Sequence, residues 1–174
     1  MGMEKSVCSN CQKSKAALSC GICESIICKY CAQFLEEETF SYLPEIPADL
    51  SHSVYCQTCF QDKVEGALQA YNHDLESAKE ILVFFKNQGK ETRLIKRLED
   101  PIQVENCLDH KDVVMRLAFL AVKAKLNGIV DIVVTSEKVR TGSYQTLKWK
   151  GIGVPAHIRA DKLLRDKSLE QTPN

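Results

Sequence analysis

The stretch Cys20-Gly-Ile-Cys-Glu-Ser-Ile-Ile-Cys-Lys-Tyr-Cys31 decides the fold of the N-terminal part of this 174-residue chain. It holds two Cys-x-x-Cys pairs separated by only four residues, and one more pair lies on each side of it. Two residues between cysteines let both sulfurs turn towards one point, which suits a tetrahedral zinc ion with ligands at about 2.3 Å. We therefore predict two zinc ions, held by eight of the nine cysteines: Cys8, Cys11, Cys20, Cys23, Cys28, Cys31, Cys56 and Cys59.

Four cysteines close a zinc site and leave no position for water or substrate, so both ions are predicted to be structural. The same cysteines could instead form disulfides, an iron–sulfur cluster or redox pairs. The start, Met1–Ser6, lacks the apolar run that secretion requires, so we expect a cytoplasmic protein with reduced thiols. The same six residues formally fit an N-myristoylation pattern, which is short enough to occur by chance.

The four pairs can be divided between two metals in two ways. Sequential sites would join the first pair to the second and the third to the fourth, whereas interleaved sites would join the first to the third and the second to the fourth. The tight spacing favours the interleaved cross-brace, with a short strand at Ser25–Ile27 between the two middle pairs. Gly21 is expected to supply the positive φ angle that metal-binding turns often need.

This order of pairs resembles FYVE-type zinc fingers and their FYVE/PHD relatives. The closing stretch Val54-Tyr-Cys-Gln-Thr-Cys-Phe60 is similar to the end of a FYVE domain, and the resemblance spans roughly residues 6–62. PHD fingers have His as the fifth ligand, where this chain has Cys28, and RING fingers usually have His as the fourth, where it has Cys23. The resemblance implies a double zinc finger and, in its lipid-binding members, recognition of phosphatidylinositol 3-phosphate.

The residues that FYVE domains use for lipid binding are not at their expected positions. Those domains carry a basic Arg/Lys-His-His-Cys-Arg stretch around the third cysteine, where this chain has Ala16-Ala-Leu-Ser-Cys20-Gly. The N-terminal tryptophan motif is also missing, because the only tryptophan is Trp149. Membrane recruitment through a phosphoinositide therefore stays an alternative and not the leading prediction.

The charge of the finger argues in the same direction. Residues 1–60 carry four Lys and seven Asp or Glu, a net charge of −3, which eight thiolates and two Zn²⁺ would lower to about −7. Anionic membranes and nucleic acids repel such a surface, and three lysines are too few to reverse the effect: Lys13, Lys15 and Lys29. We therefore expect no nucleic-acid partner but a protein partner or self-association. The segment Leu43–Leu50, with two prolines, is predicted to be an extended surface loop or a partner-binding loop.

The remaining chain predicts a long connecting helix and a second small domain. Apolar residues recur every three or four positions from Phe60 to Asn87, so residues 61–89 are predicted to connect the finger (residues 1–60) to a domain at 90–157. Residues 158–174 are predicted to form a tail with a short helix near Ala160–Arg165. The apolar face of the connecting helix is expected to pack against other parts of the same chain, with a dimeric coiled coil as the alternative.

Within residues 90–157 the pattern predicts an α+β domain with a mainly antiparallel sheet. Strands are expected at 92–98, 102–108, 129–135 and 144–155, and a helix at 111–126. Asp109 or His110 is expected near the start of this helix, and Gly142-Ser143 is expected to turn the chain between the last two strands. The alanine-rich helix, Asn127-Gly128, the valine run and Gly151-Ile-Gly-Val-Pro-Ala156 resemble small YbjQ-like bacterial domains. That resemblance implies association through sheet edges. The metal binding attributed to the family is not carried over, because Cys107 is a lone thiol and reads as a core residue.

No motif points to enzymatic activity. The chain has no phosphate-binding Gly-rich loop, no His-Glu-x-x-His and no Gly-x-Ser-x-Gly, and its four histidines are scattered: His52, His73, His110 and His157. A RING-like ubiquitin-ligase adaptor is the second alternative, and it would use apolar positions beside the cysteine pairs: Ile22, Ile26 or Ile27. The sequence thus predicts a non-enzymatic double zinc finger that presents an interaction or assembly surface.

Overall fold

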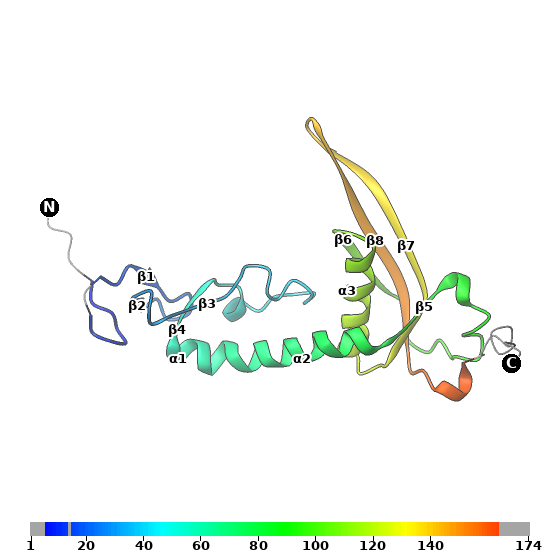
Figure 1. Ribbon diagram of the computed structural model, residues 1–174, viewed down its shortest axis with the longest axis horizontal. Helices are drawn as coiled ribbons and strands as arrows, with labels where there is room; N and C mark the ends of the chain where they lie inside the picture. The colour runs from blue at the N-terminus through cyan, green and yellow to red at the C-terminus, as the bar shows by residue number, and fades with distance from the viewer. Residues whose placement is uncertain (1–5, 14, 164–174) are drawn as a thin grey trace, which may run out of the picture. The chain divides into compact units, whose positions relative to one another are not determined.

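A computed structural model describes residues 6–13 and 15–163 of the chain (Figure 1). The chain divides into two compact units, Met1–His73 and Asp74–Asn174. Helices and strands occur in both, and the sheets are antiparallel or mixed, which is compatible with the predicted α+β class. Residues 1–5, which hold most of the myristoylation pattern, lie outside the described residues.

The N-terminal unit contains two small antiparallel sheets. Strands β1 (Leu18–Ser19) and β2 (Ile26–Ile27) form one, which confirms the short strand predicted between the middle cysteine pairs. Strands β3 (Ala32–Phe34) and β4 (Val54–Cys56) form the other. The buried cluster beside them consists of two cysteines and three small or medium apolar residues, namely Cys8, Cys28, Ala16, Ile27 and Ala32.

The segment between the third and fourth cysteine pairs is anchored on apolar side chains. It contains the 3₁₀ turn η1 (Ala48–Leu50), whose Leu50 is buried. Phe40, just before it, packs edge-on against Tyr71 with ring centroids 5.1 Å apart. The tip around Ile46 stays exposed, so the predicted surface loop is present between buried anchors.

The helical region is shorter than predicted. It consists of α1 (Gln57–Cys59), a π-helical segment η2 (Phe60–Glu65) and α2 (Gly66–Glu80). The helix does not reach residue 87, because β5 (Leu82–Phe85) follows it and pairs in parallel with β7. A short apolar run such as Leu82-Val-Phe-Phe fits a helix or a strand equally well by periodicity.

The C-terminal unit is built on a four-stranded sheet in the order β5-β7-β8-β6. Strands β6 (Ile102–Cys107), β7 (Gly128–Thr141) and β8 (Tyr144–Ala156) pair antiparallel, and β5 pairs in parallel. Gly142, with φ +62°, turns the chain between the two longest strands, as predicted. The ends of β7 and β8 that adjoin this turn extend beyond β6 as a two-stranded arm (Figure 1).

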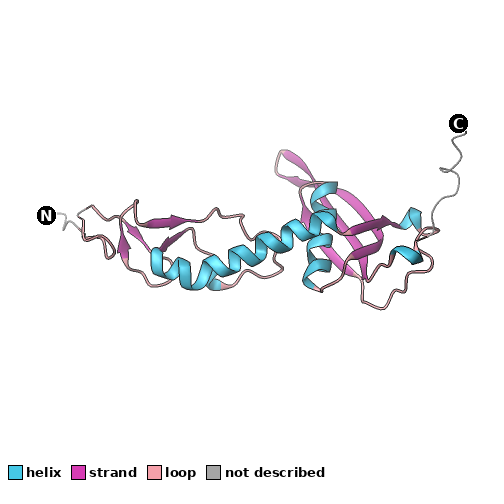
Figure 2. Ribbon diagram, turned by 60° about the horizontal axis from the view of Figure 1, so that its bottom comes forward, coloured by secondary structure: helices cyan, strands magenta, loops and turns pink. Residues whose placement is uncertain are grey.

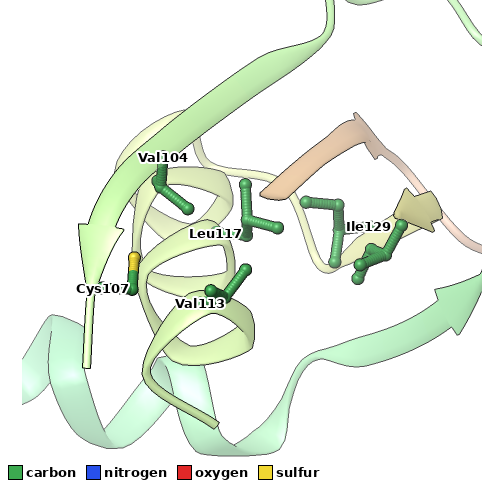
Figure 3. Close-up of a cluster of buried hydrophobic side chains, with 6 residues drawn as sticks. Val104, Cys107, Val113, Leu117 and Ile129 are labelled. Atoms are coloured by element: carbon green, nitrogen blue, oxygen red, sulfur yellow. The ribbon is translucent and has the colours of Figure 1, made fainter. Parts of the chain in front are cut away.

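Helix α3 (His110–Lys123) packs on one face of this sheet (Figure 2). The carboxylate of Asp109 caps it by accepting a hydrogen bond from the backbone N–H of Asp112 at 2.8 Å. Figure 3 shows Val113 and Leu117 of the helix beside Val104, Cys107 and Ile129 of the strands. Gly151 admits this close contact, because a Cβ there would lie 2.3 Å from a methyl group of Val113.

The opposite face is covered by irregular chain. A second buried cluster there combines Ile95, Val130, Ala156 and Ile158. The strand predicted at 92–98 is wrong, because residues 89–101 form turns and irregular structure after the 3₁₀ turn η3 (Lys86–Gln88). The sheet of this unit includes β5, and Ile158 belongs to the buried cluster on this face.

The predicted C-terminal helix is present as a 3₁₀ turn, η4 (Ala160–Lys162), and residues 164 and 165 lie outside the described part of the chain.

Candidate metal centres

The eight paired cysteines form two groups in the N-terminal unit. The first contains Cys8, Cys11, Cys28 and Cys31, and the second contains Cys20, Cys23, Cys56 and Cys59. Within each group all four sulfurs lie within 4.8 Å of one another. The first pair thus meets the third, and the second meets the fourth. Over residues 6–13 and 15–163, these are the groups of His, Cys, Asp and Glu with a geometry that could hold a metal ion.

The sulfur spacing has the dimensions of a metal tetrahedron. Ligands at about 2.3 Å in tetrahedral directions place neighbouring sulfurs about 3.8 Å apart. The distance from Cys11 Sγ to Cys28 Sγ is 3.7 Å, and that from Cys23 Sγ to Cys56 Sγ is 3.8 Å. A disulfide would need about 2.05 Å, and all nine cysteines are free thiols. Either group is therefore the right size for one metal ion with four thiolate ligands.

The first two pairs fold into the same turn. The backbone N–H of Gln12 donates to the carbonyl of Cys8, and that of Glu24 donates to the carbonyl of Cys20, both at 2.9 Å. Gln12 and Glu24 also share a left-handed backbone, with φ of 60° and 58°. Non-glycine residues adopt this region at a cost of about 1–2 kcal/mol, so the surrounding structure must hold them there. Sequence reasoning missed both residues, because a glutamine and a glutamate carry no local signal for it.

Gly21 has a different role from the one predicted. Its φ is not positive; instead, a Cβ at this position would lie 2.3 to 2.7 Å from atoms of the His52 side chain. The His52 ring packs edge-on to that of Tyr55, with ring centroids 6.1 Å apart, and the backbone N–H of His52 donates to the Tyr55 hydroxyl at 3.1 Å. The glycine is needed because the loop preceding β4 crosses closely over the second cysteine group.

Backbone N–H groups point at the sulfurs and favour their ionised form. The N–H of Cys28 donates to Cys8 Sγ at 3.3 Å, and that of Cys59 donates to Cys56 Sγ at 3.4 Å. The N–H groups of Cys11 and Cys28 lower the pKa of Cys8 to about 6. Burial acts to raise the pKa of Cys20, but backbone N–H groups of Cys23 and Cys56 outweigh it and lower this pKa to about 6 as well.

A second cysteine in each group is held protonated in the absence of metal. Burial and the neighbouring thiols raise the pKa of Cys31 to about 12, and the same causes raise the pKa of Cys59. Four thiolates at such distances repel one another too strongly to ionise together without a cation. Each group thus has an anionic member that attracts a metal ion and further thiols that would release protons when the ion binds.

The apolar residues beside the cysteine pairs differ in exposure. Ile27 is fully buried and Ile22 is half-buried, whereas Ile26 is 42% exposed. Larger exposed side chains of this unit are Tyr30, at 84%, and Phe34, at 60%. Tyr30 lies between two ligands of the first group, and Lys29 Nζ lies 5.1 Å from the centre of its ring. Ile27 therefore belongs to the core, whereas Ile26, Tyr30 and Phe34 are exposed to solvent.

The remaining predicted residues lie outside both cysteine groups. Cys107 is 2% exposed, and burial raises its pKa, so the predicted core thiol is confirmed. His73 is exposed on α2, and His110 stacks on Phe85 with ring centroids 5.5 Å apart. His157 lies after β8. None of the four histidines is close enough to either cysteine group to be a ligand.

Comparisons with family models, with curated proteins and with solved structures give no match to this chain. The resemblances to FYVE-type fingers and to YbjQ-like domains therefore rest on the quoted residues alone. Within the described residues, no helix combines the length and the apolar character that crossing a membrane requires.

Proposed function

We propose that this protein is a structural zinc-binding module, without enzymatic activity of its own, that presents a surface for a protein partner or for assembly. The observation that carries the proposal is the pair of four-sulfur groups, each of the size that one zinc ion fills. In this proposal the ions form the cross-brace of a FYVE-like double finger. Free thiol ligands persist in a reducing compartment, so the proposal places the protein in the cytoplasm.

The small core of the finger supports a structural role for zinc. Beside the first cysteine group, the buried side chains that are not candidate ligands are Ile27, Ala16 and Ala32. A few larger apolar side chains, such as Phe40 and Tyr55, are buried elsewhere in the same unit. A core of this size is marginal, and small domains of this kind usually depend on metal ions or disulfides. Closed four-thiolate sites also leave no open coordination position for a substrate.

Exposed apolar side chains support a protein partner. Tyr30 and Phe34 keep most of their surface in solvent although both are held by metal-binding turns or strands. Aromatic side chains of this kind are enriched at the centres of protein interfaces. By contrast, the described part of this unit carries four Lys and eight Asp or Glu, a charge of −4 before any thiolate is counted. An anionic membrane would repel that surface.

Native mass spectrometry with and without a strong chelator tests the metal assignment. We expect two zinc ions per chain, and a Cys23→Ser variant should retain one. Zinc-free protein, or protein whose mass is lower by the hydrogens of disulfide bonds, would contradict the assignment.

A photo-crosslinking amino acid placed at position 30 or 34 tests the interaction surface. We expect one defined adduct, with this chain or with another polypeptide, that a crosslinker at the exposed Lys13 does not give. Loss of the adduct in the Cys28→Ser variant would tie the surface to the metal.

Co-sedimentation with vesicles that contain phosphatidylinositol 3-phosphate tests the alternative, and we expect no binding. Binding that disappears in a Lys13→Ala/Lys15→Ala variant would replace the protein-partner proposal with membrane recruitment.

A further inference from the structure

The C-terminal unit contains a cavity of 450 Å³ that the zinc sites do not explain. Its walls come from the irregular loop of residues 89–101, from the segment 155–162 after β8, and from Leu126. A volume of this size is in the range of small-molecule sites. The cavity is therefore large enough to hold an organic ligand rather than single water molecules.

The loop that forms one wall is unusually long for a connection without secondary structure. It spans 13 residues between η3 and β6, and loops of that length in compact domains are commonly functional. One side chain fixes its shape. Arg97 donates two hydrogen bonds to the carboxylate of Asp131, from Nε at 2.8 Å and from a terminal nitrogen at 3.0 Å.

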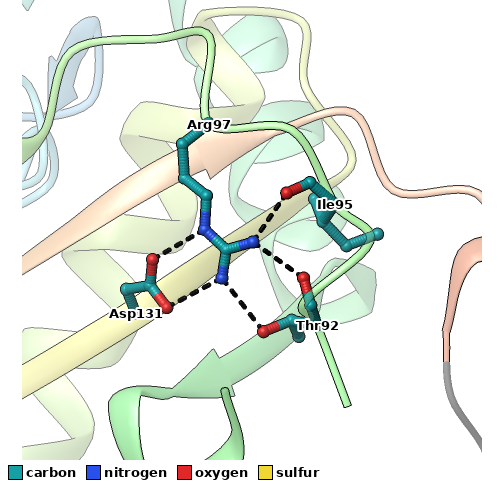
Figure 4. A network of polar contacts seen from close by, with 4 residues as sticks. All are labelled: Thr92, Ile95, Arg97 and Asp131. Carbon is teal, nitrogen blue, oxygen red and sulfur yellow. Dashed lines mark hydrogen bonds and ion pairs between the residues drawn. The ribbon is translucent and has the colours of Figure 1, made fainter. Parts of the chain in front are cut away.

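The same guanidinium also binds the loop backbone (Figure 4). It donates to the carbonyls of Thr92 at 2.7 Å and Ile95 at 2.6 Å. Asp131 reaches it from a bulge in β7, where its φ is +57°. With these carbonyls fixed by Arg97, the neighbouring residues Leu94, Lys96 and Leu98 line the cavity. The wall is thus held in place without strand pairing.

The cavity has an apolar floor. Ile95 and Ala156 are 5% and 2% exposed, and Pro155 beside them is buried. Two leucines of the loop also line it but remain open to solvent: Leu94 is 48% exposed and Leu98 is 80% exposed. Leucine side chains left in water beside a cavity gain free energy when an apolar group covers them.

The charges around the cavity favour an anion. Lys96, Arg159 and Lys162 line it against one carboxylate, that of Glu99. Arg159 already pairs with Asp161 at 3.0 Å. Within residues 6–13 and 15–163, Lys96 and Lys162 have no ion-pair partner, so two ammonium groups remain available to a ligand.

We propose that this cavity binds an amphiphilic anion, namely a hydrocarbon chain that ends in one carboxylate or phosphate group. The chain lies on the apolar floor and covers Leu94 and Leu98, and the anionic group meets Lys96 and Lys162. This binding activity is separate from the zinc sites, because every residue that carries it belongs to the C-terminal unit.

Titration of the zinc-loaded full chain with octanoate, monitored by amide chemical shifts in NMR, tests the proposal. We expect saturable shifts confined to residues 94–99, to Leu126 and to residues 155–162. Octyl phosphate distinguishes the two head groups by its relative affinity. The matched compounds 1-octanol, acetate and inorganic phosphate, each lacking the charge or the chain, should bind at least tenfold more weakly.

Variants separate the charge from the apolar contact. Lys96→Ala/Lys162→Ala should weaken octanoate binding about tenfold, because each charge-assisted contact is lost. Leu94→Ser/Leu98→Ser should weaken it several-fold, and both leucines are exposed enough to change without unfolding. Lys138→Ala/Arg140→Ala, at the far end of the β7–β8 arm, is the control and should leave the affinity unchanged. Equal binding of 1-octanol and octanoate, shifts elsewhere in the chain, or no saturable shift would overturn the proposal.

Discussion

Removal of metal from the first cysteine group should unfold that part of the chain and leave the second unit intact. Structural zinc sites contribute about 10–16 kcal/mol in small finger peptides. The side chains buried beside this group that are not candidate ligands are Ile27, Ala16 and Ala32, and Leu18 and Val54 are partly buried against them; together they supply roughly 5–8 kcal/mol. The metal term is therefore larger than this local apolar term, and without it the segment has too little burial to offset its conformational entropy.

Hydrogen exchange read by mass spectrometry is the assay. After chelation, amides of residues 16–34 should exchange as in an unfolded chain, whereas those of α3 and of the paired part of β7 should keep their protection. The second unit should keep its protection because its core is built on Val113, Leu117 and Ile129, and none of its described residues belongs to a group that could hold a metal ion.

A matched pair of substitutions controls for the chelator. Cys28→Ser should reproduce the loss of protection and lower the zinc count, whereas Cys107→Ser should leave two zinc ions because Cys107 belongs to neither group. Preserved protection of residues 16–34 in protein shown to be metal-free would refute the reasoning.

Three further outcomes follow from the geometry. Metal affinity should fall as pH is lowered, because protons compete with the metal ion for the thiolates. At pH 7 each group should release fewer than four protons per ion, because the pKa values of Cys8 and Cys20 are already about 6. Calorimetry in buffers of different ionisation enthalpy counts the released protons. Asp131→Asn should destabilise the C-terminal unit by about 1–3 kcal/mol at pH 7. Arg97 lowers the pKa of Asp131, so this stabilisation is complete above the unfolded pKa of about 3.9 and is lost as pH falls through the lower pKa of the folded state. The free energies of unfolding of the two proteins, taken from denaturation curves, should therefore converge at that low pH. A difference that stays constant with pH would count against the ion pair. Gly151→Ala should cost about 1–3 kcal/mol in thermal or chemical denaturation because its Cβ would clash with Val113, whereas Gly66→Ala, with nothing within 4 Å of the added Cβ, should be neutral or stabilising.

Local patterns predicted the elements whose signals lie within a few neighbouring residues. Helix α3 follows from its apolar period and from Asp109 at its start, and the β7–β8 hairpin follows from a β-branched run and the Gly142-Ser143 turn. The set of candidate ligands follows from the Cys-x-x-Cys spacing, since one pair supplies half of a four-cysteine group. These features depend on residues that are close in the chain, so the sequence alone was sufficient.

Other features depend on partners far away in the chain. Leu82-Val-Phe-Phe became a strand because β7, more than 40 residues later, offers it a parallel partner. Residues 92–98 stayed irregular because Arg97 binds their carbonyls and ties the loop to Asp131. The position of Gly21 inside a cysteine pair indicated a turn, but glycine is required there because the side chain of His52 leaves no room for a Cβ.

The sequence by itself determined that eight cysteines come in four pairs, and hence how many metal ions they suit. Only the tertiary structure decided that sulfurs distant in the chain converge to within 4.8 Å, which side chains around them stay exposed, and that Lys96 and Lys162 line a cavity. The physical reason is that ligand chemistry and periodicity are local properties, whereas convergence, burial and cavities arise when segments remote in sequence pack together.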